Sequence, residues 1–231
     1  ANRPRNLAAR DNFAHHGFYG GNTLMLDILG ANREELDVGN GDFAAAIEAT
    51  RATLRSAADI VIEKAVLEKP AAGKRDLVVR VRVNNNSGHK LPTSYPSRRV
   101  YLHLTVADHT GATLFESGRL ETDSNGKATG AIAGVDADTG TGYEPHYSGE
   151  ITSADQVQVY EPIMEDRDGR QTYTLLNAAR YRKDNRILPR GFGDRATEDM
   201  AVVAAVGQAA ADPDFVAGSD LVTYRIPLGA E

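Results

Sequence analysis

Cysteine is absent from the 231 residues of this chain. Its absence excludes disulfides, thiolate nucleophiles and cysteine-ligated zinc within the chain, and it excludes covalent attachment of haem through thioether bonds. Tryptophan is absent too, and aromatic residues make up only 6% of the sequence. A carbohydrate-binding platform of stacked rings would therefore depend on the nine tyrosines.

Long hydrophobic runs are also missing. No segment approaches the roughly 18 consecutive apolar residues that a membrane-spanning helix needs, so we expect no membrane span. The net charge is -6, and the arginines are scattered rather than gathered with aromatics into a stripe, which argues against a nucleic-acid surface. Residues 1–12 are polar and lack the apolar region of a signal peptide. We interpret the sequence as a mature chain or a fragment.

Residues 1–58 are predicted to form an amino-terminal arm followed by two helices. Asn22 and Asp42 are residue types that accept hydrogen bonds at helix N-termini, and they predict helices over 23–29 and 42–57. The second helix has apolar side chains at helical spacing and arginines near its carboxyl end, where the helix dipole favours positive charge.

From residue 59 to 231 the apolar period changes from 3.6 to 2, which is typical of half-buried strands. A polar excursion over 118–155 has little predicted regular structure, and a loop of that length is usually functional or covers a partner. The strands joined by Gly, Pro and Asp turns predict a mainly β fold, an antiparallel β-sandwich of immunoglobulin-like type. Strands are predicted over 60–67, 77–83, 100–106, 112–117, 156–163, 201–206 and 221–226.

The strands over 77–83 and 100–106 have the clearest alternation in the chain. Their apolar residues share one phase, and side chains two positions apart lie on the same face of a sheet. We therefore expect the core to contain Val79, Val81, Val83, Leu102, Leu104 and Val106.

The loop over 84–99 joins those two strands and holds residue types that bind ligands. It contains His89, the paired arginines Arg98 and Arg99, and two prolines that fix the backbone and stiffen the loop. A stiff loop can present an imidazole at a fixed angle to a metal, a haem iron or a proton-transfer partner. In the alternative interpretation the loop is an ordered connection, in which His89 caps backbone carbonyls and the arginines pair with surface acids.

Other catalytic and metal-binding patterns are weak. The chain has no His-x-x-x-His pair and no Gly-x-Ser-x-Gly motif, so an enzyme centred on His89 and His146 would lack a recognisable nucleophile or metal site. Two acidic groups could suggest calcium, but short turns supply fewer ligands than calcium takes. These groups are Glu165, Asp166 and Asp168, and Asp212, Asp214 and Asp220.

Several segments together resemble the carboxyl-terminal β-sandwich region of bacterial multihaem c-type cytochromes. The most specific is GHKLPTSYPSRR over residues 88–99, followed by an alternating strand and FESG over 115–118. The turn HGFYGGN over 16–22 is similar to a His-x-Phe-x-Gly-Gly-Asn turn of that family. Further similar segments are EPHY over 144–147, QVYE over 158–161 and KDNRILP over 183–189, so the resemblance covers about residues 10–226.

In such cytochromes two histidines commonly hold the haem iron, one of them from a Cys-x-x-Cys-His motif. This chain has no such motif, so the resemblance implies that haem c is carried by a separate multihaem chain. It implies His16 and His89, and less directly His146, as candidate distal iron ligands. Arg98 and Arg99 become candidate partners of the haem propionates.

The interpretation favoured by this resemblance is a soluble, exported, non-catalytic subunit of a multihaem electron-transfer complex, in the periplasm or outside the cell. The alternative is an extracellular ligand- or carbohydrate-recognition β-sandwich module. In that case the loop over 84–99 and the excursion over 118–155 would form the binding edge.

Overall fold

The computed structural model describes residues 19–69, 74–93, 98–135, 142–193 and 198–228. It divides into two compact units, Ala1–Ser56 and Ala57–Glu231, which are described separately below. Strands hold 36% of the residues and helices 16%, which confirms a mainly β chain with several antiparallel sheets. No helix in the described ranges is both long enough and apolar enough to cross a membrane.

The first unit contains two helices, α1 (Leu24–Ala31) and α2 (Phe43–Ser56). As predicted, Asp42 caps α2: its Oδ1 accepts a hydrogen bond of 2.9 Å from the backbone N–H of Ala45. Gly30 of α1 lies beside Phe43 of α2, and a Cβ at position 30 would make an ordinary contact of 3.6 Å with the Cβ of Phe43.

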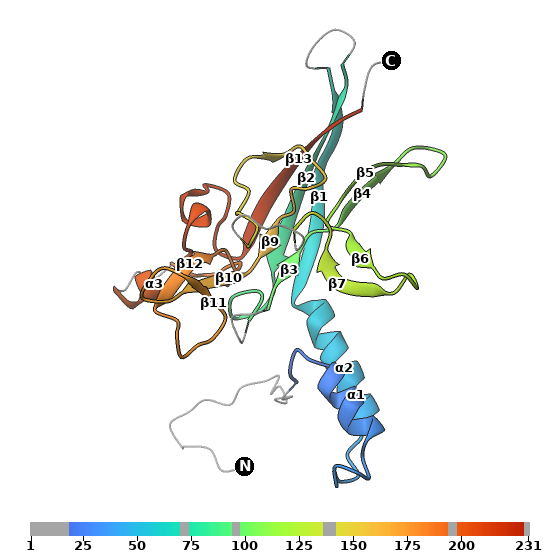
Figure 1. Ribbon diagram of the computed structural model, residues 1–231. Coiled ribbons are helices and arrows are strands. Elements are labelled where there is room, and N and C mark those ends of the chain that lie inside the picture. The colour runs from blue at the N-terminus through green and yellow to red at the C-terminus, as the bar shows by residue number, and fades with distance from the viewer. Residues whose placement is uncertain (1–18, 70–73, 94–97, 136–141, 194–197, 229–231) are drawn as a thin grey trace, which may run out of the picture. The chain divides into compact units, whose positions relative to one another are not determined.

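A four-stranded sheet is the centre of the second unit, and its strand order is β1-β2-β13-β8 (Figure 1). All neighbours are antiparallel except β13 and β8. The last strand of the chain, β13, thus lies between β2 and β8, which come much earlier in the sequence. The four strands are β1 (Ala58–Glu68), β2 (Asp76–Asn85), β13 (Ser219–Pro227) and β8 (Glu150–Ile151).

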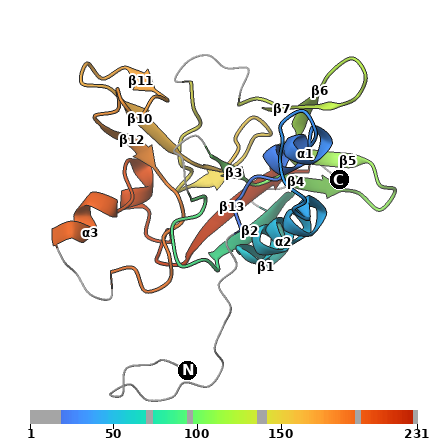
Figure 2. The ribbon, with the colours of Figure 1, turned by 90° about the horizontal axis from the view of Figure 1, so that it is seen from below.

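Four smaller sheets accompany the large one (Figures 1 and 2). Three of them are pairs: β3 with β9, β4 with β5, and β6 with β7; the fourth has the order β11-β10-β12. Their strands are β3 (Val100–Tyr101), β4 (Leu104–Ala107), β5 (Thr113–Ser117), β6 (Leu120–Thr122), β7 (Ala128–Ile132), β9 (Val159–Tyr160), β10 (Pro162–Glu165), β11 (Gln171–Thr172) and β12 (Arg180–Asp184).

The strand predicted over 100–106 is divided, because β3 and β4 pair with different partners. Gly118, which follows β5, lies against this break. A Cβ on Gly118 would lie 2.1 Å from the carbonyl oxygen of Leu102, and Gly118 has φ of 80°, so only glycine fits there.

Two other predictions from the sequence are wrong. The expected strand over 201–206 is mostly a helix, α3 (Glu198–Val203), followed by an isolated bridge from Val206 to Asp184. Its apolar run does not alternate, and alanine favours helix. The excursion over 118–155 is also more regular than expected, since it contains β6, β7 and β8.

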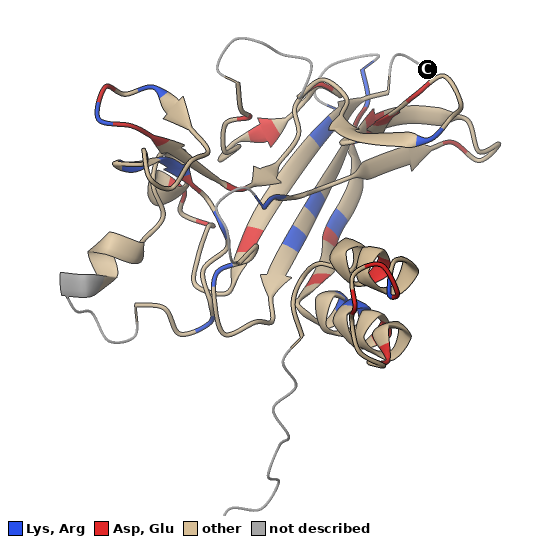
Figure 3. Ribbon diagram, turned by 60° about the horizontal axis from the view of Figure 1, so that its bottom comes forward, with Lys and Arg blue, Asp and Glu red and all other residues tan. Residues whose placement is uncertain are grey.

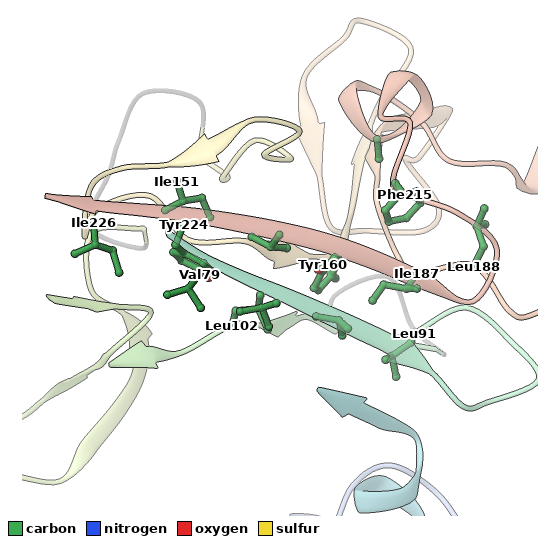
Figure 4. Close-up of a cluster of buried hydrophobic side chains, with 14 residues drawn as sticks. Val79, Leu91, Leu102, Ile151, Tyr160, Ile187, Leu188, Phe215, Tyr224 and Ile226 are labelled. Atoms are coloured by element: carbon green, nitrogen blue, oxygen red, sulfur yellow. The ribbon is translucent and has the colours of Figure 1, made fainter. Parts of the chain in front are cut away.

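The main core lies on and around β2 and β13 (Figure 4). The expected core residues Val79, Val81, Val83 and Leu102 are buried, and this part of the prediction is confirmed. Leu104 and Val106 are only partly buried, because β4 packs against the edge of the cluster. Sequence periodicity did not assign the large side chains that complete this core, which are Leu91, Ile151, Tyr160, Ile187, Leu188, Phe215, Tyr224 and Ile226.

Charged side chains of both signs are interspersed over the strands (Figure 3). Arg225 on β13 donates to both carboxylate oxygens of Glu150, at 2.6 and 2.8 Å, and to Glu68 at 3.0 Å. Arg82 on β2 donates from Nε to one carboxylate oxygen of Glu63 on β1. The outer strands of the sheet are therefore linked by ion pairs.

Candidate functional site

The loop that carries His89 is fixed by a buried asparagine at the end of β2. Asn85 is fully buried, and its Nδ2 donates to the carbonyl oxygens of His89, at 2.7 Å, and Ile187, at 3.0 Å. Its Oδ1 accepts from the backbone N–H of Ser87 at 2.9 Å. Leu91 continues the attachment through a backbone bridge to Ile187. Each end of the segment 85–91 is thus held against one distant part of the chain.

A buried ion pair provides a second anchor. Lys90 Nζ donates to Asp184 Oδ2 at 2.7 Å, and Arg186 donates to both oxygens of the same carboxylate, at 2.7 and 2.8 Å. Burial would raise the pKa of Asp184, but the hydrogen bonds from Arg186 and Lys90 outweigh it and leave this pKa below its ordinary value. Burial lowers the pKa of Lys90. The pair ties the loop to the end of β12.

The His89 side chain itself is exposed, and its Nδ1 lies 3.0 Å from the carbonyl oxygen of Lys90. A carbonyl oxygen can only accept, so this contact is a hydrogen bond when Nδ1 carries the proton. In the neutral ring the lone pair is then on Nε2. Histidines that bind metals commonly have this arrangement, in which the second nitrogen donates to a backbone carbonyl and fixes the ring.

The other predicted contributors near this loop are less well placed. Arg98 and Arg99 lie immediately before β3 and are partly buried. His16 lies outside the described residues, as does the segment 94–97 of the loop, so the structure gives no distance between His89 and His16. The structure thus assigns geometry to His89 and a position to the arginines.

His146 is in a different environment, because it is buried and both ring nitrogens are bonded. Nε2 lies 2.8 Å from Asp212 Oδ2, and Nδ1 lies 2.8 Å from Gln158 Nε2 and 3.2 Å from Asn185 Nδ2. The two amides cannot be turned without loss, since the oxygen of each accepts a backbone N–H at 2.9 Å, from Tyr147 and Glu161 respectively. Nδ1 therefore accepts and Nε2 carries the proton.

The tautomer of His146 decides whether this cluster is a metal centre. His146, Asp212 and Asp220 offer ligand atoms that all lie within 4.8 Å of one another. A cation on Nε2 would displace its proton while two amide donors keep Nδ1 unprotonated, so the ring would have to become an anion. Burial also lowers the pKa of His146. The cluster is better described as a hydrogen-bonded network around a neutral imidazole than as a metal site.

Asp220 is the second buried acid of this network, beside Asp212. Its Oδ2 accepts from the Tyr160 hydroxyl at 2.7 Å and from Gln158 Nε2 at 3.1 Å. Among the described residues, Asp220 Oδ1 and the Tyr224 hydroxyl are buried without a hydrogen-bond partner. Burial raises the pKa of Asp220 to about 7. A buried carboxyl with one unsatisfied oxygen is consistent with a group that holds its proton near neutrality.

The acids considered for calcium at the turn after β10 have other partners. Glu165 pairs with Arg180 and, at 2.8 Å, with Arg182. Asp168 pairs with Arg170 at 2.8 Å, and Asp166 Oδ1 accepts backbone N–H groups of the turn. These contacts explain the acids as turn and ion-pair residues.

Sequence reasoning missed the residues that position the two histidines. Asn85, Asp184 and Gln158 were not predicted as positioning residues, although Asn85 follows and Gln158 lies within a predicted apolar strand. That signal was available, because a polar side chain at a buried position requires partners. The partners could not be named, since Asn85 and Ile187 are 102 residues apart.

Comparison with known proteins gave no match among family models, curated proteins or solved structures.

Proposed function

We propose that this chain is a non-catalytic component of a multihaem electron-transfer complex, and that His89 supplies a distal axial ligand to a haem c carried by a partner chain. The observation that supports the proposal most is the hydrogen bond of 3.0 Å between His89 Nδ1 and the Lys90 carbonyl oxygen. It places the lone pair on Nε2 of an exposed ring.

The contacts that hold the loop around His89 support the same role. An axial ligand needs a defined ring plane and iron distance, and ordering a mobile side chain on binding would cost free energy. The backbone carbonyl of His89 is held by Asn85 at 2.7 Å, and the side chain of the next residue, Lys90, is held by Asp184 at 2.7 Å. The backbone that carries the ring is therefore held in place without a haem.

Of the other candidate residues, three are kept in the proposal and one is not. Arg98 and Arg99 are proposed to pair with haem propionates, because a guanidinium matches a carboxylate. His16 remains a second proposed ligand. His146 is not retained, because its Nε2 donates to Asp212 and its Nδ1 accepts from Gln158.

The proposal includes the setting of the chain. A partner bearing haem c places the complex in the periplasm or outside the cell. For the fold, we propose that the smaller sheets cover the large one as a β-sandwich of immunoglobulin-like type.

A haem c peptide that carries one axial histidine and one open iron position tests the ligand role directly. Adding the wild-type chain should convert its iron from high spin to low spin, as measured by the Soret band and by electron paramagnetic resonance. His89→Ala should weaken this conversion by at least about tenfold in concentration, which is about 1.4 kcal/mol.

The matched control is His103→Ala. His103 is exposed like His89, but its Nε2 lies 2.8 Å from Glu116 Oε1. This variant should convert the haem peptide like wild type. Equal conversion by wild type and His89→Ala, with circular dichroism unchanged, would remove His89 from the proposal.

A further inference from the structure

A hollow of ≈ 370 Å³ lies between the end of the His89 loop, β12 and α3. Figures 1 and 2 both show α3 beside β12. The residues that give the hollow its chemistry are Lys90, Arg186, Tyr181, Phe192, Val202 and Val203. One end is cationic and the rest is apolar.

The cationic end carries more positive than negative charge. Lys90 and Arg186 share the single carboxylate of Asp184, with contacts of 2.7 and 2.8 Å. The side chains of Lys90 and Arg186 are only 14% and 12% exposed. None of the residues described as lining the hollow is acidic. One unit of positive charge is therefore left uncompensated at a poorly solvated place.

Arg186 also has N–H donors that do not point to Asp184. A guanidinium has five N–H donors. One on Nε and one on a terminal nitrogen point to Asp184, and the guanidinium carbon lies 5.5 Å from the centre of the Tyr181 ring. The carboxylate and the ring together hold the guanidinium in one orientation. A guanidinium held in one orientation binds a second carboxylate better than a mobile guanidinium does.

The walls of the hollow are apolar and partly open to solvent. Val202 is 78% exposed and Val203 is 49% exposed, and Phe192 is partly buried against the core. Exposed apolar side chains next to a desolvated charge are unfavourable for inorganic anions, which keep their hydration. They are favourable for an anion with an apolar body, because covering the valines removes apolar surface from water.

We propose that this hollow binds a small carboxylate with an apolar body, of the size of one aromatic ring. Its volume is near the lower end of the range for small-molecule sites, about 300 to 1,000 Å³. The carboxylate would lie at Arg186 and Lys90, and the ring would lie against Phe192 and the two valines. The inference stands independently of the proposed haem ligand, because it uses neither His89 nor a partner chain.

Benzoate is the probe, and methyl spectra of the full chain report on Val202 and Val203. We expect saturable shifts of these methyl signals, with a dissociation constant on the order of millimolar for so small a ligand. Benzamide has the same shape without the charge, and should bind at least about tenfold more weakly. Inorganic phosphate should not displace benzoate at equal concentration.

Val202→Glu adds a negative charge at the rim on an exposed residue and should weaken benzoate binding at least about tenfold. Leu114→Glu is the control, since Leu114 is 52% exposed on β5 and does not line the hollow. The proposal is overturned by any of three results: no saturation by about 50 mM benzoate, equal binding of benzamide, or equal binding by the two variants.

Discussion

His89 and His146 differ in which ring nitrogen carries the proton. His89 is exposed and its Nδ1 faces a carbonyl oxygen, whereas His146 is buried and its Nδ1 faces two amide donors. The proton is therefore on Nδ1 in the first ring and on Nε2 in the second. The groups that contact Nδ1 decide which nitrogen carries the proton, and therefore whether Nε2 has a lone pair for a metal. By this criterion His89 is the better metal ligand, although more carboxylates surround His146.

The two regions also differ in what their polar groups do for stability. The His89 loop uses a buried ion pair as an anchor, and the His146 region uses hydrogen bonds around a neutral imidazole and two buried acids, Asp212 and Asp220. Substitutions that remove one group from each region test this difference.

The largest effect is expected for Asp184→Asn. The change leaves the side chains of Lys90 and Arg186, which are 14% and 12% exposed, without their shared carboxylate. Leaving a buried charge without its partner typically costs about 3 to 5 kcal/mol, and we expect that loss in the free energy of unfolding measured by chemical denaturation. Asp168→Asn removes the exposed pair with Arg170 and should cause no measurable loss. Equal losses would show that the loop is not anchored as described.

The next effect concerns pH and Asp220. Its pKa is about 7 in the folded chain and about 3.9 in an unfolded chain, so between these values the folded state binds more protons. The contribution of Asp220 to the free energy of unfolding should therefore fall as pH rises from about 4 through 7, by up to about 4 kcal/mol.

Asp220→Asn removes this titration and resembles the protonated acid. The stability of the variant should change less with pH in this window, and it should gain on wild type as pH rises toward 8. Parallel stability curves for the two proteins in denaturation series from pH 4 to 8 would mean that Asp220 does not titrate as described.

A smaller but more direct comparison is His146→Ala with His89→Ala. Truncating His146 leaves Gln158, Asn185 and Asp212 with lost partners in a buried place, which should cost about 2 to 4 kcal/mol. Truncating the exposed His89 should change the free energy of unfolding by less than about 0.5 kcal/mol. If His89→Ala were as destabilising as His146→Ala, His89 would be a structural residue.

The sequence predicted the central strands well where the pattern was unambiguous. The strands predicted over 60–67, 77–83 and 221–226 correspond to β1, β2 and β13. β2 and β13 carry buried residues of the core, whereas β1 is an edge strand on which Ile60, Val61 and Ile62 are exposed. The prediction failed over 201–206, where apolar residues follow one another without alternation and helix and strand cannot be told apart.

Within the candidate site, the sequence predicted His89 but not the residues that hold its loop. His89 was found because an imidazole lies between turn residues and prolines in one stretch. Its anchor Asp184 was not found, because it is 94 residues away and reaches the loop only in the fold. His146 illustrates the opposite problem: the sequence shows a histidine, but only the neighbours of its Nδ1 show that it is engaged.

The position of the proton on the two rings is the most direct test of the account. A long-range 1H–15N correlation spectrum, recorded above the pH at which imidazole loses its charge, distinguishes protonated from unprotonated ring nitrogens. His89→Ala and His146→Ala assign the signals. The account predicts a protonated Nδ1 in His89 and a protonated Nε2 in His146. A protonated Nε2 in His89 would contradict it, because that ring would then have no lone pair to offer an iron at its exposed edge.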